Sequence, residues 1–333
     1  MQLPAPLQRA LERMITSQAN TALEQTVATL SNRYRTASDH HVPAITTPLE
    51  AIAYAVWRMP ATYAALRATF QRLAEVQPDF SPTRMLDIGA GSGAAIWAAA
   101  EQWPSLRRIV AIERQPAMAR IGEQLAASAD LPAITWQRSD VLTLERLPES
   151  DLVVAGYIFG EIEPAARGIL LSRLWKATTG ALVLVEPGTP VGHTTILGLR
   201  SELIKRSAHI LAPCPHTADC PLAAKGDWCH FAQRIARPAF LRRIKGAKAP
   251  FEDEKFAYLI AARDGQPSTS GRIVRHPLIH SGRIELQICT AQGLQQITVT
   301  RSQGKAWRQA RNSSWGDGWD DNPTPDIGGS NEK

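Results

Sequence analysis

A glycine-rich turn between an apolar strand and a helix is the feature that most constrains how this chain can fold. The apolar run Met85-Leu86-Asp87-Ile88 is followed by Gly89-Ala90-Gly91-Ser92-Gly93, and the composition of residues 94–102 is that of a helix. Strand, glycine turn and helix, in that order, begin the nucleotide-binding half of a doubly wound parallel sheet. Because glycine carries no Cβ, this turn lets the backbone pass close to a bound ligand.

Four more apolar runs continue the alternation of strands and helices, at 108–112, 134–136, 151–155 and 181–185. Such alternation predicts an α/β fold with a parallel sheet covered by helices on both faces. Upstream, apolar residues recur at helical spacing over residues 3–78. Here Thr47 is the expected N-cap before Pro48, and two helices are expected on either side of Met59-Pro60.

Shorter runs of alternating character, 272–274, 283–289 and 296–300, predict a small antiparallel β unit near the C-terminus. We therefore expect a helical N-terminal region at 1–79, a cofactor-binding domain at 80–205 and a cysteine-bearing, partly antiparallel β module at 206–320. Residues 321–333 are rich in Gly, Asp, Asn and Pro, which predicts a disordered tail.

The spacing of the glycines argues against a dinucleotide, whose pyrophosphate site uses G-x-G-x-x-G. A carboxylate directly before the loop suits a cationic or amino group, and S-adenosylmethionine has a sulfonium, an α-amino group and no phosphate. Glu113, about twenty residues past the loop, is placed to accept the ribose hydroxyls. Asp140, after the third strand, is placed to meet the adenine amino group.

This pattern resembles the class I S-adenosylmethionine-dependent methyltransferases over about residues 80–190, which have a Rossmann-like doubly wound sheet. The resemblance implies S-adenosylmethionine as the cofactor, with these binding residues: Asp87, Gly89, Gly91, Gly93, Glu113 and Asp140. The alternative is a glycine turn that serves only close helix–sheet packing.

Residues that follow the fourth strand are the candidates for catalysis. Such enzymes place groups facing the methyl donor there, and Tyr157 and Glu161 are suited to orient an acceptor or to take its proton. The alternative is that both residues pack against and cap the next helix. The chain lacks Asn-Pro-Pro-Tyr, Asp-Pro-Pro-Tyr and a Pro-Cys nucleophile at this position, which argues against base-amino and cytosine C5 methylation.

All four cysteines fall in the C-terminal part of the chain, at Cys214, Cys220, Cys229 and Cys289. Four thiolates hold either a tetrahedral zinc or an iron–sulfur cluster. Structural zinc usually shows pairs of cysteines two to four residues apart, so the looser spacing here favours the larger cluster. Zinc bound by three cysteines and either His216 or His230 remains an alternative.

Several motifs together resemble one family, the methyltransferase-like proteins associated with the small subunit of the mitochondrial ribosome, in a bacterial-type version. They are Arg58-Met59-Pro60-Ala61-Thr62-Tyr63, the glycine loop with Trp97, Cys214-Pro215-His216, Cys220-Pro221, Trp228-Cys229-His230-Phe231 and Trp315-Gly316-Asp317. The match runs over about residues 45–319. It implies a 4Fe–4S cluster on Cys214, Cys220, Cys229 and Cys289, and binding to small-subunit ribosomal RNA during assembly.

The net charge of +6 is modest, but basic residues gather just after the cysteines. This run either forms a solvated face or contacts RNA phosphates, and its members are Arg234, Arg237, Arg242, Arg243, Lys245 and Lys248. Trp307, Arg308 and Arg311 are candidates to add to such a surface, and Trp315 and Trp319 are expected either to stack on bases or to pack on the β unit.

The first residues lack the pattern of a secretory signal, and no stretch approaches the length of a membrane span. We therefore expect a cytoplasmic monomer with reduced thiols and without a membrane partner. Three functions remain open. They are methylation of ribosomal RNA, ribosome assembly with a retained cofactor pocket, and methylation of a non-RNA substrate by a protein with structural zinc.

Overall fold

The computed structural model describes residues 1–16, 20–36 and 45–320. The chain divides into two compact units. The first unit comprises Met1–Ala212 and Trp228–Gln266, and the second comprises Pro213–Asp227 and the chain from Pro267 onward. The predicted disordered tail, 321–333, lies outside the described residues.

Three helices open the first unit: α1 (Ala5–Thr16), α2 (Asn20–Thr36) and α3 (Pro48–Val76). As predicted, Thr47 caps α3 with Pro48 in the first turn, and its hydroxyl accepts a hydrogen bond from the Glu50 backbone N–H at 3.1 Å. The predicted break at Pro60 is wrong, because α3 runs through it as one helix. Proline removes one backbone hydrogen bond, and here Pro60 and its neighbour Met59 are buried, so packing holds the helix together.

The sheet of the first unit has the strand order β3-β2-β1-β4-β5-β8-β6. The strands β1 to β5 pair in parallel, and β8 is antiparallel to both β5 and β6. This confirms the predicted α/β fold with a class I methyltransferase sheet. The bounds are β1 (Arg84–Ile88), β2 (Arg108–Ile112), β3 (Ala133–Gln137), β4 (Ser150–Gly156), β5 (Thr178–Pro187), β6 (His209–Ala212), β7 (Phe231–Ala236) and β8 (Phe251–Ala262).

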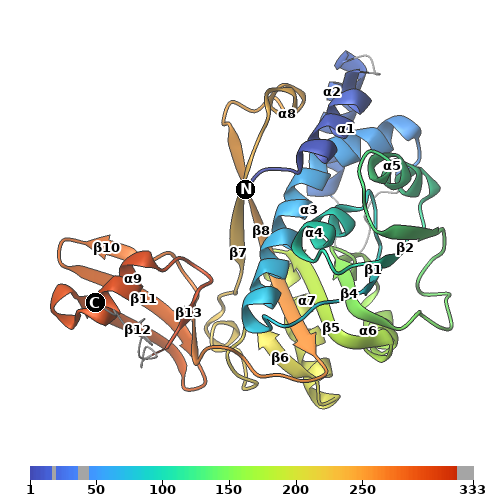
Figure 1. The fold of residues 1–333 in the computed structure, drawn as a ribbon. Helices are drawn as coiled ribbons and strands as arrows, with labels where there is room; N and C mark the ends of the chain where they lie inside the picture. Colours follow the sequence, from blue (N-terminus) through green and yellow to red (C-terminus); the bar gives the residue numbers. More distant parts are fainter. Residues whose placement is uncertain (17–19, 37–44, 321–333) are drawn as a thin grey trace, which may run out of the picture. The chain divides into compact units, whose positions relative to one another are not determined.

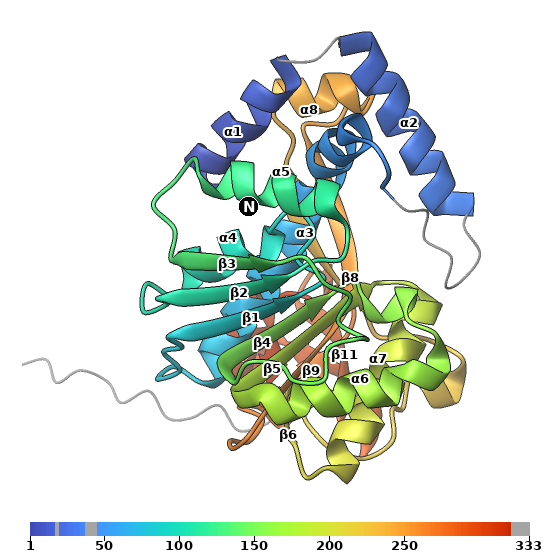
Figure 2. The ribbon, with the colours of Figure 1, turned by 90° about the vertical axis from the view of Figure 1, so that its right-hand side faces the viewer.

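Helices lie on both faces of this sheet (Figure 2). One group packs around α3 and contains α4 (Ala94–Gln102) and α5 (Pro116–Ala126). The other group contains α6 (Pro164–Ala177) and α7 (Pro190–Lys205), which pack against β5 and each other. A short 3-10 turn, η1 (Phe159–Glu161), follows β4. Because β1 and β2 run side by side, the ends of both strands meet at one edge of the sheet.

β7 and β8 form a long antiparallel ribbon that carries α8 (Ala239–Ile244) at its tip (Figure 1). We call residues 231–256 the β7–β8 arm. The structure thus divides the chain differently from the expected boundary at 205/206, since β6, β7 and β8 all join the first unit. The physical reason is the buried apolar run of β8, residues 256–262, which pairs with β5 along its length.

The second unit is the predicted antiparallel β structure. Its strands are β9 (Gly271–Ile273), β10 (Leu278–His280), β11 (Arg283–Thr290), β12 (Gly293–Thr300) and β13 (Gly318–Trp319), with the helix α9 (Lys305–Asn312) and the short turns η2 (Ala223–Lys225) and η3 (Arg301–Gln303). β11 pairs with β9, β10 and β12. Its core includes Ile273, Leu286, Val299, Ala310 and Trp319. Among the described residues of the whole chain, no helix is both long enough and apolar enough to span a membrane.

Candidate functional site

The glycine loop adopts a backbone that suits glycine at each of its three positions. Gly89, Gly91 and Gly93 have φ angles of 65°, 54° and 86°, in the left-handed region that strains residues with a side chain. A Cβ on Gly89 would lie 3.0 Å from the Ile158 side chain. The loop therefore turns tightly at the end of β1, as the sequence predicted, and leaves space beside it.

Glu113, at the end of β2, holds this loop. One carboxylate oxygen accepts a hydrogen bond from the Gly91 backbone N–H at 2.9 Å, and the other accepts one from the Gln115 N–H at 2.7 Å. Burial raises the pKa of Glu113, and these two N–H donors act against that rise. Each oxygen keeps a lone pair that can accept a further hydrogen bond, for example from a hydroxyl group of a ligand.

Asp87 is the most unusual group of the site. Its side chain is only 2% exposed, and its Oδ2 atom accepts no hydrogen bond from any described residue. Burial raises the pKa of Asp87 to about 8, with a smaller contribution from the negative charge of Glu113. A buried carboxylate oxygen without a partner costs about 1–3 kcal/mol. A cationic or hydrogen-bond-donating group that reached this oxygen would remove that cost.

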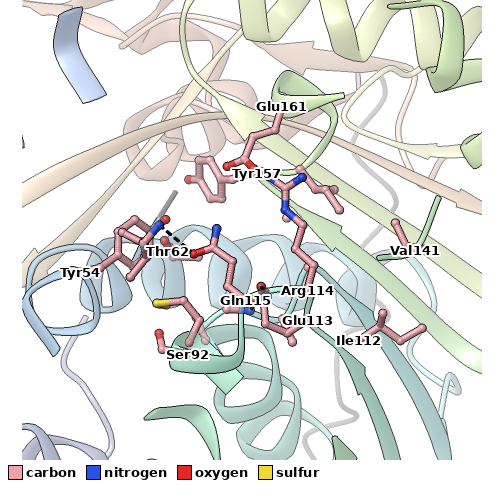
Figure 3. Close-up of a pocket in the computed structure, with 18 of the residues that line it drawn as sticks. Tyr54, Thr62, Ser92, Ile112, Glu113, Arg114, Gln115, Val141, Tyr157 and Glu161 are labelled. Carbon is pink, nitrogen blue, oxygen red and sulfur yellow. Dashed lines mark hydrogen bonds and ion pairs between the residues drawn. The ribbon is translucent and has the colours of Figure 1, made fainter. Parts of the chain in front are cut away.

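A pocket of about 960 Å³, part of it open to solvent, lies beside the loop. The predicted residue Asp140 lines it and uses one carboxylate oxygen to accept a hydrogen bond from the Leu142 N–H at 2.9 Å. Figure 3 shows Tyr54 and Thr62, both on α3, on the wall across from the strand ends. This helical wall was not predicted from the sequence, because helical periodicity marks which residues are buried and gives no indication that some border a pocket.

The candidate catalytic residues Tyr157 and Glu161 also line the pocket (Figure 3). Tyr157 has a φ angle of 60°, which is strained for a residue with a side chain. Its hydroxyl donates a hydrogen bond of 2.9 Å to Glu254 of β8, which also forms an ion pair of 2.9 Å with Arg58 of α3. Burial raises the pKa of Tyr157 well above its ordinary value. The phenol is therefore a neutral donor held by the protein, which does not suit a base.

Glu161 differs from Tyr157 because its pKa lies close to neutral pH. Burial raises its pKa to about 7, against the opposing effect of Arg114, whose guanidinium lies 3.4 Å away. Nearby, the fully buried Glu186 accepts hydrogen bonds from the backbone N–H groups of Phe159 and Gly160, at 2.8 and 3.2 Å. This role of Glu186 was not predicted from the sequence. The sequence signal that could have identified it is its position at the end of the fifth strand, because Asp87 and Glu113 also lie at the ends of their strands.

The cysteines fall in both units. Cys214, Cys220 and Cys289 belong to the second unit, and Cys229 directly precedes β7 in the first. Within the second unit, His216 Nε2 lies 3.4 Å from the Cys289 sulfur. Among the residues that the structure describes, no group of three or more His, Cys, Asp or Glu side chains is arranged to hold a metal ion. The predicted four-cysteine ligand set therefore remains a prediction from the sequence.

The surroundings of Arg272, on β9, indicate whether the chemistry around the cysteines suits an anionic metal–thiolate group. It pairs with Cys289 across the strands, so the two side chains leave the same face of the sheet. Its guanidinium is 2% exposed, donates to the carbonyls of Pro213 and Gly316, and leaves Nη2 without an acceptor among the described residues. A buried cation beside thiols fits such a group in its chemistry, although the structure does not form a ligand shell.

The basic residues expected to contact RNA are largely compensated by the acidic start of β8. Arg234 pairs with Asp253 at 2.8 Å, while Arg237 and Lys245 pair with Glu252 at 3.0 and 2.7 Å. The remaining members are the half-buried Arg242 and the exposed Arg243 and Lys248. The arm therefore presents fewer available cations than its sequence indicated.

Solved structures similar to this chain include the magnesium protoporphyrin IX methyltransferase of Synechocystis with bound SAH, at 12% identity and a TM-score of 0.42, covering 74% of this chain and 99% of that one. Another is the N-methyltransferase NodS of Bradyrhizobium japonicum, at 14% identity and a TM-score of 0.38, covering 61% and 96%. These similarities are remote, and the fold assignment rests on the sheet order above.

Curated relatives are closer. The human ribosome assembly protein METTL17, mitochondrial, is 29% identical over 289 residues, covering 80% of this chain and 61% of the relative. The Rsm22-cox11 tandem protein 2, mitochondrial, of Schizosaccharomyces pombe is 28% identical over 333 residues, covering 84% and 44%. The chain thus spans about half to three fifths of the length of these relatives.

The expected cytoplasmic location is contradicted by these comparisons, because both relatives are named as mitochondrial proteins. The expectation rested on the absence of a recognisable targeting pattern in the first residues, and that absence does not establish a location. The relatives point to mitochondria instead.

A family model described as mitochondrial small ribosomal subunit Rsm22 matches residues 48–320. The match includes α3, the glycine loop, the carboxylates of the pocket, the four cysteines and the antiparallel unit, and it confirms the resemblance predicted from the motifs. The chain belongs to the Rsm22 family.

Proposed function

We propose that this protein binds S-adenosylmethionine in the pocket beside the glycine loop and acts as a methyltransferase-like factor in assembly of the small ribosomal subunit. The observation that carries the cofactor assignment is the buried Asp87 oxygen without a partner, next to the loop held by Glu113. The ribosomal role is supported by the names of the family and of the human relative.

The groups of the pocket match the groups of S-adenosylmethionine. The ammonium or sulfonium supplies the positive charge that would stabilise an ionised Asp87. Glu113 has free lone pairs for the ribose hydroxyls while its N–H contacts keep its orientation. Asp140 has a second carboxylate oxygen for the adenine amino group.

Methyl transfer requires a group that takes a proton from the acceptor as the methyl leaves the sulfonium. We propose Glu161 for that role, because it lines the pocket and its pKa of about 7 suits a general base. Tyr157 is better described as a positioning residue, since its hydroxyl is held by Glu254. A binding factor without turnover is the alternative, and it uses the same pocket.

We also propose that Cys214, Cys220, Cys229 and Cys289 hold a metal centre, with a 4Fe–4S cluster as the first choice and zinc as the second. Iron and sulfide analysis of anaerobically purified protein tests this directly. A colourless protein with stoichiometric zinc would overturn the cluster. Iron loading that survives Cys289→Ser would remove Cys289 from the ligands and leave His216, its neighbour at 3.4 Å, as the replacement.

The main experiment measures cofactor binding and methyl transfer in one protein preparation. Titration calorimetry with S-adenosylmethionine should give binding that Asp87→Asn weakens, while Glu145→Gln on the exposed loop before β4 serves as the control. Labelled cofactor is then incubated with assembling small subunits. Label in ribosomal RNA that Glu161→Gln abolishes supports the enzyme, and binding without transfer supports the assembly factor. Absence of cofactor binding in the unaltered protein would overturn the proposal.

A further inference from the structure

The second unit has an unusual distribution of charge. From residue 265 to 316, Glu285 is the only acidic residue, whereas seven arginines and lysines occur in the same stretch: Arg272, Arg275, Arg283, Arg301, Lys305, Arg308 and Arg311. The other acidic residues of the unit, among them Asp219, Asp227 and Asp317, lie outside this stretch, so most cations of the stretch lack a carboxylate nearby in the sequence. Which of those cations are exposed and form no ion pair in the folded chain determines what the unit can bind.

At least three of the seven cations have partners within the unit. Arg272 is buried and donates to backbone carbonyls, Arg275 forms an ion pair with Asp227, and Arg283 lies 3.2 Å from Glu285. The remaining four lie together in sequence, on η3 and α9. Of these, the exposed Arg301, Arg308 and Arg311 form no ion pair with any residue that the structure describes.

The geometry of α9 places its cations on one face. Lys305, Arg308 and Arg311 follow one another at intervals of three residues, which keeps them on the same side of a helix. Ala306, Trp307 and Ala310 form the opposite side and pack against the hydrophobic core of the second unit. Figure 1 shows α9 lying along β11 and β12, which it contacts. We name Arg301, Lys305, Arg308 and Arg311 the α9 face.

The tryptophans of the second unit point to contacts with phosphates instead of bases. Trp307 packs against the core, Trp319 is buried, and the Trp315 ring lies edge-on to His276 at 4.9 Å. Single-stranded nucleic acids are usually bound by stacking on exposed aromatic rings, and these three rings are already in contact with the protein. The α9 face thus offers positive charge without a stacking platform.

We propose that the α9 face is the principal surface through which this protein contacts the phosphate backbone of RNA. The inference rests on the proposed role in small-subunit assembly and assigns to that role a surface other than the β7–β8 arm. The arm contains more basic residues, but Glu252 and Asp253 pair with three of them. Contacts of this kind are independent of base sequence and weaken steeply with salt.

The test compares two double variants that remove equal charge from the full chain. Arg308→Gln with Arg311→Gln changes the α9 face, and Arg243→Gln with Lys248→Gln removes two exposed cations of the arm that form no ion pair with a described residue. Glutamine has nearly the helix propensity of arginine, so both variants should fold. Fluorescence anisotropy measures binding to a labelled fragment of small-subunit ribosomal RNA across a series of salt concentrations.

The α9 variant should bind roughly 10- to 100-fold more weakly at about 0.1 M salt, with a slope of affinity against salt that is smaller by about two. The arm variant should change both quantities much less. S-adenosylmethionine binding and the melting temperature report that the first unit and the fold are intact.

Three results would overturn the inference. Equal losses from the two variants would mean that only the total charge matters. An unchanged α9 variant alongside normal RNA binding by the unaltered protein would place the contact elsewhere and leave the proposed function intact. Binding to vesicles of anionic phospholipid, with no binding to RNA by the unaltered protein, would remove both the inference and the ribosomal RNA role.

Discussion

The two units of this protein distribute charge in opposite ways. The pocket of the first unit is lined by buried or half-buried carboxylates, among them Glu113, Asp140 and Glu161, with Arg114 as the cation beside them. The α9 face of the second unit contains four cations, three of them exposed, in a stretch with a single carboxylate. One region therefore suits a small cationic ligand, and the other suits a polyanion. The difference shows that the overall charge of +6 describes neither region.

The strongest test of the carboxylate pocket is Glu113→Ala. It removes the acceptor of the Gly91 and Gln115 N–H groups and the expected acceptor of the ribose hydroxyls. Because hydrogen bonds to a charged group contribute about 1.5–3 kcal/mol each, S-adenosylmethionine should bind at least about 100-fold more weakly. Calorimetric titration measures the affinity, with Glu145→Gln as the matched control. Unchanged binding would show that Glu113 does not contact the cofactor.

Glu254→Ala separates a carboxylate with a structural role from those left for a ligand. The substitution leaves the half-buried Arg58 guanidinium and the Tyr157 hydroxyl without their acceptor. Breaking a buried pair costs about 3–5 kcal/mol, and partial exposure of these two side chains reduces the expected loss to about 2–3 kcal/mol. Urea denaturation measures the free energy of unfolding. Glu75→Ala, which breaks the exposed pair with Arg72, should change it by less than about 1 kcal/mol.

Asp87 should make the protein without ligand less stable as the pH rises. Its pKa is about 8 in the folded chain against 3.8 in the unfolded chain, so between these values the folded state retains a proton that the unfolded state loses. Stability from this group is complete below pH 4 and falls as the pH rises through 8. Melting curves at pH 5 and pH 8 should therefore differ less in Asp87→Asn than in the unaltered protein. An equal difference in both would contradict the assignment.

Binding of a cationic ligand to Asp87 should instead become stronger as the pH rises. A cationic ligand favours the ionised carboxylate, so binding at pH 7 should release a proton. Calorimetry in buffers of different ionisation enthalpy measures that release. Comparison with Asp87→Asn cancels the titration of the ligand itself, and equal proton release by both proteins would exclude Asp87 as the source.

The smallest effect is expected for Arg234→Gln in the β7–β8 arm. The guanidinium already pairs with Asp253 and lies 3.9 Å from the centre of the Phe251 ring. The salt dependence of RNA binding should therefore stay within error of the unaltered protein. A slope of RNA affinity against salt that is smaller by about one would show that RNA displaces Asp253 from Arg234. The arm would then contact RNA phosphates in the same way as is proposed for the α9 face.

Much of the first unit could be predicted from the sequence because its signals are local. The five parallel strands, the cap at Thr47 and the glycine loop each depend on neighbouring residues. Asp87 and Glu113 could be placed together because adjacent parallel strands end at the same edge of a sheet. The continuous α3 was not predicted, since whether Pro60 breaks a helix depends on what packs around it.

The sequence by itself determined the order of strands and helices, the glycine loop, the carboxylates at the strand ends and the family to which the chain belongs. Only the tertiary structure decided which charges remain available. Asp253 lies 19 residues from Arg234 and Glu252 lies 15 residues from Arg237, yet the pairing of β7 with β8 brings them together. Pairing across strands joins residues that are distant in sequence, and this is why a run of basic residues indicates a binding surface only after its partners in the fold are known.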